Sequence, residues 1–466
     1  MPPIKSASSP SRRHVIVKLL LLSVSCLWLV MQFQLVWTTT TSEMHPSNNH
    51  IHPKEEPNKK NPSKEDAAST NSTSVGCILV MDDNHRLVEW LAYHHFTMNL
   101  RYLIVAIDPR STTSPEPIME RWKPYGLQYQ IWGDDDYMGA RVRDKRNRLF
   151  ELGRKQLTMV HRVRQKAFYQ YCLEHLDSLG LKKWTLLLDV DEYLVIRKDT
   201  FTMENPQHDF STAMATQGGV YQFVQDMTKK SQQVGNTNDQ TQYEQFASPC
   251  ISIPRILFGT TTSADFAEQS GSSSPVPSVL PQQLQNRLDT IRWFYHAHYS
   301  EFDRNGLAKT ILDLSRVQIP KPHFPNPVNP HRPFQDLCRD PKRILDINEH
   351  ALLRVHHYLS TWETYSFRND SRKGGERSRE AWEFRALHAR DGPTMDIVAW
   401  LQGFVHQYGL ETATQLLEGA GVPSSYTHAP QVNQQWNFLF TQDFLDKSNS
   451  QYESKFGRFL RNRTLT

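Results

Sequence analysis

Residues 184–196 read Trp-Thr-Leu-Leu-Leu-Asp-Val-Asp-Glu-Tyr-Leu-Val-Ile, an apolar run that is interrupted by three acidic residues. Such a run is typical of a strand that is buried on both faces of a mostly parallel sheet. Because side chains alternate along a strand, we expect Asp189 and Asp191 on one face and Glu192 on the other. The two aspartates then lie at the carboxyl end of the strand, the edge where open α/β sheets bind ligands.

The pair Asp189 and Asp191 predicts a site for Mn²⁺ or Mg²⁺. Carboxylate oxygens are hard ligands, and these ions commonly hold a diphosphate through one or two protein carboxylates and the phosphate oxygens. An acidic loop in water is the alternative, since short acidic patterns arise often by chance. We favour the metal because unpaired carboxylates in a buried run are costly, and a cation offsets that cost. The direct interpretation is an enzyme that uses a nucleotide-diphosphate sugar.

The segments before this run alternate between strands and helices. We expect strands at residues 75–81, 102–107 and 127–132, and helices at 87–94 and 115–122. This alternation implies right-handed crossovers and a parallel sheet with its ligand at the strand ends. The sequence contains neither a Gly-x-Gly-x-x-Gly fingerprint nor a P-loop, which argues against a dinucleotide or ATP cradle.

Asp82, Asn84 and Asp108 follow the first two predicted strands and are our candidate nucleotide contacts. Helix N-caps are an equally good explanation for each of them. The densest basic stretch, residues 141–166, contains ten Lys or Arg. Apolar residues recur at helical spacing through and beyond it, so we interpret its charges as the solvated face of a helix. The formal net charge of +4 is also modest for 466 residues, and no nucleic-acid partner is expected.

The N-terminal segment predicts a single-pass membrane protein. Residues 15–37 are largely apolar, long enough to span the hydrocarbon core, and preceded by three Lys or Arg. This positive charge predicts a cytosolic tail at residues 1–14 and a luminal side after Trp37. A cleaved signal peptide is the alternative, but Trp37 and the threonines after it offer no small-residue cleavage pattern.

Residues 38–74 are rich in polar residues and proline, and they predict a flexible luminal stem. Patterns for N-glycosylation follow the anchor at Asn71, Asn369 and Asn462. Disulfides persist in an oxidising lumen, and their pairing is left open by the spacing of the luminal cysteines. These are Cys77, Cys172, Cys250 and Cys338.

The rest of the chain predicts one large α/β domain at residues 75–385 and a helical extension at 386–466. Two stretches dense in Gln, Ser, Thr and Asn, at about 226–248 and 260–286, predict polar insertions. Such segments have too little apolar surface to fold by themselves.

An apolar pattern returns at residues 251–259, and residues 290–297 and 352–358 predict strands. His356 in the last of these is a candidate third metal ligand, although a lone histidine is more often a structural hydrogen-bonding residue. After Arg379 the chain turns helical. We expect its core to contain Trp382, Trp400 and Phe404.

Taken together, these segments resemble glycosyltransferase family 92, and the order and approximate spacing match over roughly residues 75–385. The Asp-Val-Asp-Glu-Tyr segment is the most specific part. The likeness rests on Glu89-Trp90-Leu91-Ala92-Tyr93-His94, Arg164-Gln165 with Cys172, residues 184–194, Ile253-Pro254-Arg255-Ile256-Leu257-Phe258-Gly259, Lys309-Thr310-Ile311, His357-Tyr358 and residues 371–377.

The resemblance implies a metal-dependent GT-A enzyme of the secretory pathway with a Rossmann-like mixed sheet. It implies inverting transfer of a sugar, first of all galactose from UDP-galactose, to a glycan or glycoprotein acceptor in the Golgi. It assigns metal and diphosphate binding to Asp189 and Asp191. Inversion needs a carboxylate base, for which Glu301, Asp303 and Glu363 are candidates and Glu363 is our working assignment. The alternative is a membrane-anchored glycan-binding or interaction protein on a decayed transferase fold, since fold does not establish function.

Overall fold

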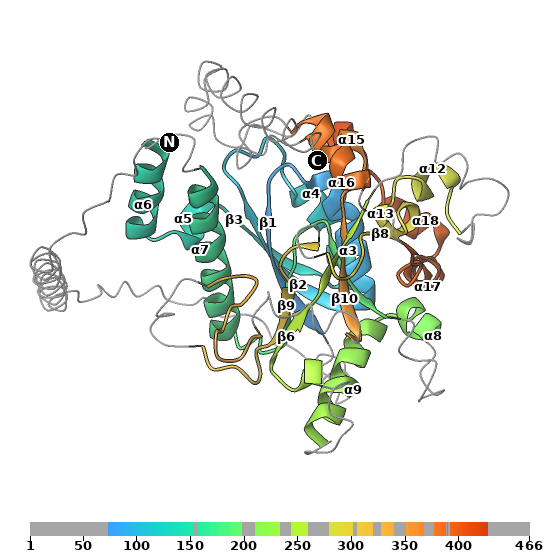
Figure 1. Ribbon diagram of the computed structural model, residues 1–466, viewed down its shortest axis with the longest axis horizontal. Coiled ribbons are helices and arrows are strands. Elements are labelled where there is room, and N and C mark those ends of the chain that lie inside the picture. The colour runs from blue at the N-terminus through green and yellow to red at the C-terminus, as the bar shows by residue number, and fades with distance from the viewer. Residues whose placement is uncertain are drawn as a thin grey trace, which may run out of the picture. The chain divides into compact units, whose positions relative to one another are not determined.

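A computed structural model describes most of the chain after residue 72 (Figure 1). The described residues are 73–151, 157–197, 210–233, 244–259, 279–301, 305–319, 328–339, 351–367, 377–387, 389 and 392–426. All of them belong to one compact unit, Ser63–Thr466. The predicted anchor, the stem up to residue 72 and the three glycosylation patterns lie outside the described residues. Within the described part of the chain, no helix is sufficiently long and apolar to cross a membrane.

The larger of two sheets has six strands. In spatial order they are β3 (Gln128–Trp132), β2 (Leu100–Ile107), β1 (Ser74–Val80), β4 (Trp184–Leu187), β9 (Lys309–Asp313) and β6 (Cys250–Ile253). The first four run parallel, and β9 is antiparallel to both of its neighbours. The strands predicted at 75–81, 102–107 and 127–132 are therefore confirmed. Parallel strands end at the same edge, so the acids that follow β1, β2, β3 and β4 are brought to one side of the sheet.

The second sheet has five strands. In spatial order they are β11 (Gly392–Pro393), β8 (Tyr295–His296), β7 (Arg255–Phe258), β10 (Leu353–Tyr358) and β5 (Glu192–Ile196). β10 is parallel to β7 and antiparallel to β5, and it confirms the strand predicted at 352–358. Both sheets are mixed, so the chain has a mixed α/β fold that is compatible with a Rossmann-like arrangement.

Helices and short 3-10 turns surround the sheets. They are α3 (Asn84–Thr97), α4 (Glu116–Glu120), η1 (Lys123–Tyr125), α5 (Asp134–Tyr137), α6 (Ala140–Glu151), α7 (Leu157–Ser178), α8 (Phe210–Ala215), α9 (Gly219–Gln233), η4 (Glu244–Phe246), α12 (Gln282–Gln285), α13 (Asp289–Arg292), α15 (Trp362–Phe367), α16 (Arg379–Leu387), α17 (Ala399–Tyr408), α18 (Leu410–Leu416) and η7 (Pro423–Tyr426).

Helix α3 is buried along its whole length, because it packs against β2 of one sheet and β5 of the other. Its Leu87 and Trp90 belong to the largest hydrophobic cluster, together with Leu194 of β5. Helix α7 covers the opposite face of the six-stranded sheet, where Phe168 and Leu176 form a second cluster (Figure 1). The helix predicted at 87–94 is confirmed, and its burial on all sides holds the two sheets together.

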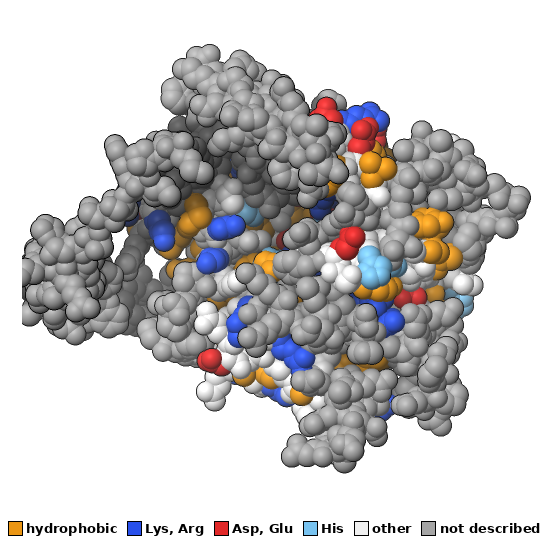
Figure 2. All heavy atoms as spheres, viewed as in Figure 1, with side chains coloured by type: hydrophobic (Ala, Val, Ile, Leu, Met, Phe, Trp, Pro, Cys, Tyr) orange, Lys and Arg blue, Asp and Glu red, His pale blue; other side chains and the backbone are white. Residues whose placement is uncertain are grey.

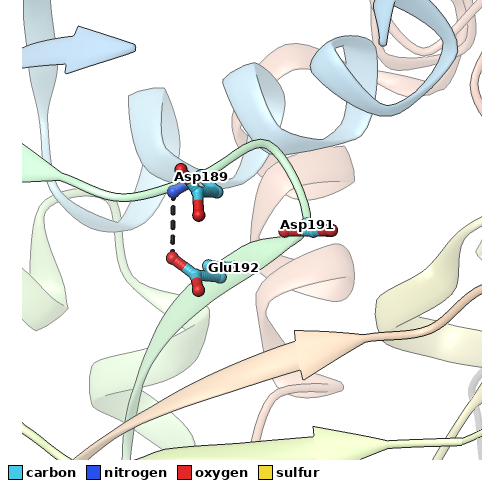
Figure 3. A group of neighbouring side chains, drawn as sticks. All are labelled: Asp189, Asp191 and Glu192. Atoms are coloured by element: carbon cyan, nitrogen blue, oxygen red, sulfur yellow. Dashed lines mark hydrogen bonds between the residues drawn. The ribbon is translucent and has the colours of Figure 1, made fainter. Parts of the chain in front are cut away.

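The run at residues 184–196 forms two strands in different sheets: the acids follow the first strand, as predicted, but the expected alternation of side chains through Glu192 is wrong. β4 ends at Leu187 and β5 begins at Glu192. Between them, the Glu192 amide donates to the Asp189 carbonyl at 3.1 Å, and the Asp189 amide donates to the Glu192 carboxylate at 2.9 Å. These bonds replace strand pairing at the turn, so the alternation of side chains breaks there and Glu192 points back toward Asp189 (Figure 3).

Two other apolar segments also divide, and the second of them differs from the strand that was predicted for it. Residues 251–259 divide at Pro254 into β6 and β7, because proline has no N–H to donate to a ladder. Of residues 290–297, only Tyr295–His296 is a strand, and α13 precedes it. The buried carboxylate of Glu89 accepts the amides of Asp289 and Thr290, at 2.7 and 2.9 Å, and these bonds favour a turn.

Part of each predicted polar insertion is folded. Helix α9 continues to Gln233, because Val220, Val224 and Met227 recur at helical spacing and are buried. Leu284 of α12 is buried as well. The remaining residues of the two insertions, 234–243 and 260–278, lie outside the described part of the chain.

The basic stretch at residues 141–166 contributes to two helices, α6 and α7. Most of its described Lys and Arg are at least partly exposed, as predicted, but Arg146 and Arg164 are buried. On the face of the molecule shown in Figure 2, Lys and Arg side chains are dispersed among apolar and uncharged ones.

The luminal cysteines form two disulfides, Cys77–Cys172 and Cys250–Cys338. The first joins β1 to α7, and the second joins β6 to a segment 88 residues further along the chain. Both bonds lie in the hydrophobic cluster beneath α7. The structure thus supplies the pairing that the sequence left open.

Candidate active site

Three carboxylates come together at the turn between β4 and β5. Asp189, Asp191 and Glu192 each offer one oxygen within 4.8 Å of the others (Figure 3). The side chain of Asp189 is 38 % exposed and that of Asp191 is 15 % exposed, whereas Glu192 is fully buried. The two aspartates therefore face accessible space, and the glutamate supports the turn from within.

Three cations of the protein itself neutralise this group. Lys309 Nζ lies 2.6 Å from Asp189 Oδ2 and 2.9 Å from Glu192 Oε2. Arg255 donates to Glu192 Oε1 at 3.0 Å, and Arg86 donates to Asp191 Oδ2 at 2.9 Å. Burial raises the pKa of Asp189, but the nearby Lys309 ammonium outweighs burial and holds this pKa at about 2. The cost of burying these acids, which favoured a bound metal in the sequence argument, is offset in the structure by Lys309, Arg255 and Arg86, so the metal stays a prediction.

His357, and not the predicted ligand His356, lies beside the acids. His357 Nε2 is 3.6 Å from Asp191 Oδ2. Adjacent residues of β10 point to opposite faces, so His356 is buried against the ring of Phe258, with a centroid distance of 4.2 Å. Burial lowers the pKa of both histidines, although Asp191 partly opposes this effect at His357. The structure does not bring His356 to the carboxylates.

A cavity of about 220 Å³ opens beside Asp189 and Asp191. Its lining contains five arginines, four aspartates and two histidines, and because burial lowers the pKa of His357 the positive charge comes from the arginines. These charged residues are Arg86, Arg110, Arg255, Arg377, Arg385, His161, His357, Asp83, Asp108, Asp189 and Asp191. A cavity with this balance suits an anionic ligand, and arginine forks match phosphate geometry particularly well.

The predicted nucleotide contacts Asp82 and Asn84 serve the loop that follows β2. Asp82 Oδ1 accepts the amides of Thr112 and Thr113 at 2.7 and 2.9 Å, and Asn84 Nδ2 donates to the Ser114 carbonyl at 2.8 Å. Asp82 itself has a positive φ of 53°. Neither Asp82 nor Asn84 lines the cavity formed by the described residues. Their contact with a nucleotide stays a prediction.

Asp108, the third predicted contact, lines the cavity but is bound to two arginines. Arg110 donates to both of its oxygens, each at 2.8 Å, and Arg164 donates to Oδ2 at 2.9 Å. Burial alone would raise the pKa of Asp108, but Arg164 and Arg110 hold it well below its usual range. Arg164 also reaches Asp134 at the end of β3, so this network fastens neighbouring strand ends together.

The two candidate bases that the structure describes, Glu301 and Glu363, do not line the cavity. Glu363 is exposed on α15 and is not among the described residues that line it. Glu301 is partly buried in the turn that follows β8, and Asp303 lies outside the described residues. Tyr365, two residues after Glu363, does line the cavity. The choice of Glu363 as base therefore stays a prediction.

Sequence reasoning gave no role to Arg86, Arg255, Lys309 and His357, which complete the site. Three of them lie in segments that carry the resemblance to family 92, and a basic residue at the start of an apolar strand was the available signal for Arg255 and Lys309. No protein-family model, curated protein or solved structure matches the chain.

The turn fits a divalent cation at two of its three acids. Asp189 and Asp191 present oxygens at the edge of the cavity, and hard carboxylate oxygens are suitable ligands for Mn²⁺ or Mg²⁺. Glu192 is fully buried and its oxygens are taken by Lys309, Arg255 and the Asp189 amide. Asp189 and Asp191 are the residues that can hold a metal.

Proposed function

We propose that the protein is a metal-dependent glycosyltransferase of GT-A type that moves a hexose from a UDP-sugar to a glycan acceptor with inversion. The observation that carries the proposal is the pair Asp189 and Asp191 at the end of β4, facing a cavity lined by arginines. Carboxylates hold a divalent ion and arginines hold phosphates, and a nucleotide-diphosphate sugar needs both. UDP-galactose is the first donor to test.

The arginines of the cavity would bind and orient the diphosphate. Arg86 and Arg255 are each anchored by a carboxylate of the turn, at 2.9 and 3.0 Å, so their guanidinium groups are already oriented. Preorganised cations next to a leaving group stabilise its developing charge without further rearrangement. Arg377 stacks on Tyr365 with 4.2 Å between its guanidinium carbon and the ring centroid, and it supplies positive charge from the other part of the lining.

Asp189 and Asp191 would hold the metal, and a bound divalent ion supplies positive charge against the leaving diphosphate. His357 lies 3.6 Å from Asp191 and would keep that carboxylate in position. Membership of family 92, the Golgi location and the N-terminal membrane anchor belong to the same proposal, and they follow from the sequence features set out above. The two disulfides support an oxidising compartment.

One observation favours the alternative of a glycan-binding or interaction protein. Each acid of the turn is already paired with a cation of the protein, so the negative charges of the turn are neutralised without a metal. A binding protein would need no more than this.

Ligand-dependent unfolding separates the two functions. A ligand that binds only the folded protein raises its melting temperature. We expect UDP-galactose, or another UDP-hexose, to raise the melting temperature of the full chain with Mn²⁺ but not with EDTA, and UDP to be released when a glycan acceptor is added. GDP-mannose is the matched control for the nucleotide. Stabilisation by glycans alone, with no effect of any nucleotide sugar, would favour the binding protein.

A further inference from the structure

Lys309 joins an accessible acid to a buried one. It is the first residue of β9, its side chain is 1 % exposed, and its Nζ lies 2.6 Å from Asp189 Oδ2 and 2.9 Å from Glu192 Oε2. Its backbone is fixed, because β9 pairs with β4 on one side and β6 on the other. The ammonium group is therefore held at the carboxylate cluster by the sheet itself.

The two acids that pair with Lys309 differ in their exposure to solvent and in how many other groups bind them. Glu192 is fully buried, and its carboxylate is also bound by Arg255 at 3.0 Å and by the Asp189 amide at 2.9 Å. The Asp189 side chain is 38 % exposed, and Lys309 is the cation paired with it among the described residues. If one of the two acids exchanges Lys309 for another cation, that acid is therefore Asp189.

Arg86 repeats this arrangement at the second aspartate. One of its terminal nitrogens donates to Asp191 Oδ2 at 2.9 Å, and the other donates to the Leu359 carbonyl at 3.2 Å. Arg86 therefore also keeps a second acceptor if Asp191 turns to another cation. Since Arg86 lines the cavity, its charge would then be available to a phosphate group.

We propose that Lys309 is a resident counter-cation that sets the metal affinity of the site. It neutralises Asp189 in the metal-free protein, and it yields Asp189 to Mn²⁺ while keeping its bond to Glu192. Lys309 is thus a positioning residue rather than a metal ligand. The inference rests on the proposed metal site at Asp189 and Asp191, and it explains how those acids stay buried in part before a metal arrives.

The exchange also predicts that metal and nucleotide bind together. The three acids are balanced by three cations, so an added divalent ion leaves excess positive charge at the turn. A diphosphate beside the turn offsets that excess. Binding of each ligand then favours binding of the other, as linkage requires. We expect Mn²⁺ to bind more tightly in the presence of UDP than alone.

Mn²⁺ titration of Lys309→Gln, followed by electron paramagnetic resonance, tests the proposal. Loss of a unit charge within a few ångströms of the metal should tighten Mn²⁺ binding without nucleotide on the order of tenfold or more. The melting temperature in EDTA should fall, whereas that at saturating Mn²⁺ should approach the wild-type value. Lys309→Arg, which keeps the charge, should bind Mn²⁺ less tightly than Lys309→Gln.

The matched control is Lys183→Gln, which removes a lysine charge at the opposite end of β4 and should leave Mn²⁺ affinity unchanged. Unchanged or weaker Mn²⁺ binding by Lys309→Gln overturns the inference and leaves the proposed function in place. If the wild-type chain binds no Mn²⁺, with or without UDP, the proposed metal site and the inference both fall.

A second measurement does not depend on any variant. Crystal structures of the wild-type protein in EDTA and with Mn²⁺ and UDP should differ at the contact between Lys309 and Asp189. With the metal, Lys309 Nζ should remain within hydrogen-bond distance of Glu192 and should no longer be within that distance of Asp189. An intact contact between Lys309 and Asp189 in the metal-bound structure would refute the exchange.

Discussion

Two groups of ion pairs lie at strand ends of the six-stranded sheet, and they differ in what surrounds them. At the ends of β2 and β3, Arg164 joins Asp108 and Asp134, and these side chains are 1 %, 2 % and 9 % exposed. At the end of β4, Lys309 is equally buried, but its partner Asp189 is 38 % exposed. In both groups acids follow strands of this sheet, yet of the two only the group at Asp189 has an accessible carboxylate.

The contrast shows how acids with the same sequence signal take different roles. Arg164 donates three bonds of 2.9 to 3.0 Å to its two aspartates, so each of its three nitrogens is engaged within the fold. Lys309 carries a single ammonium that bridges a fixed acid and a freer one. We therefore interpret the Arg164 group as structural and the Asp189 group as the candidate binding site.

The largest expected effect comes from breaking the Arg164 group. Arg164→Met leaves Asp108 with Arg110 and Asp134 with Arg146. Removing one partner of a buried ion pair costs about 3 to 5 kcal/mol when the charge left behind is uncompensated, so we expect a loss near the lower end of that range. Urea unfolding measures this loss. Arg162→Met, an exposed arginine on the same helix, is the control and should change the free energy of unfolding little. A loss below about 1 kcal/mol in Arg164→Met would show that this group does not stabilise the fold.

The second largest effect comes from the Asp189 group. Asp191→Asn keeps the shape of the side chain but removes a charge that would hold the metal, so sugar transfer should fall about a hundredfold or more. Folding should survive, and Asp189→Asn should behave alike. Steady-state transfer assays and melting temperatures with and without Mn²⁺ measure both parts. Wild-type transfer by Asp191→Asn would contradict the metal assignment.

A third buried acid sharpens the comparison, because its described hydrogen bonds come from uncharged donors. Glu89 accepts from the Asp289 amide and from the amide and hydroxyl of Thr290. Burial, followed by repulsion from Asp289, raises the pKa of Glu89 from 4.5 to about 8. The folded protein then binds a proton that the unfolded chain has lost, so this contribution to stability is full below pH 4.5 and declines as the pH rises toward 8.

The pH dependence of unfolding tests this account of Glu89. Each protonation difference changes stability by at most about 1.4 kcal/mol per pH unit. Buried His94 and His95, whose pKa burial lowers to about 3, oppose the effect below pH 6.5, so the decline should be clearest between pH 6.5 and 8. Glu89→Gln cannot titrate and should reduce the slope there, although it should be less stable at every pH. An unchanged slope would contradict a raised pKa at Glu89.

The smallest effect concerns the neighbour of Asp134. Asp135 pairs with Arg143, but their side chains are 87 % and 38 % exposed. Exposed ion pairs contribute little, so Asp135→Asn should change the free energy of unfolding by less than about 0.5 kcal/mol. Urea unfolding of Asp135→Asn is compared with that of Asp134→Asn, since the two residues are adjacent and differ mainly in burial. Equal losses in the two variants would show that burial does not distinguish them.

Local patterns were sufficient for the parts of the fold that depend on local hydrophobicity. The strands β1, β2, β3 and β10 and the helix α3 follow from apolar residues at the expected spacing. The acids at Asp189 and Asp191 were also found, because a buried run that stops on charge is visible in the sequence.

The features that were missed depend on contacts between distant residues. The turn after Leu187 rests partly on Lys309, which is 120 positions from Asp189. The helical turn at Asp289 and Thr290 depends on Glu89, about 200 positions away. His356 and His357 are adjacent, and only the pairing of β10 with β5 decides which of them faces Asp191. No period within the chain carries this information.

The helical segment at the end of the described chain reaches the core that supports the site. Trp400 of α17 packs on Tyr93 of α3, with ring centroids 5.5 Å apart, and donates to Thr290 Oγ1 at 2.9 Å. The Gly421 amide donates to the His85 carbonyl at 2.9 Å, one residue before Arg86.

Helix α17 also packs closely on α8, and this contact limits where the chain can be truncated. A Cβ at Gly403 would lie 1.9 Å from the Ala215 carbonyl oxygen, so the two backbones are in direct contact. The domain boundary expected at residues 385 and 386 falls inside α16. A truncated protein that stopped there would lose Trp400 and the contact at Gly421, and would open the back of α3 to water. Truncations that are meant to retain the candidate active site therefore have to extend beyond Gly421.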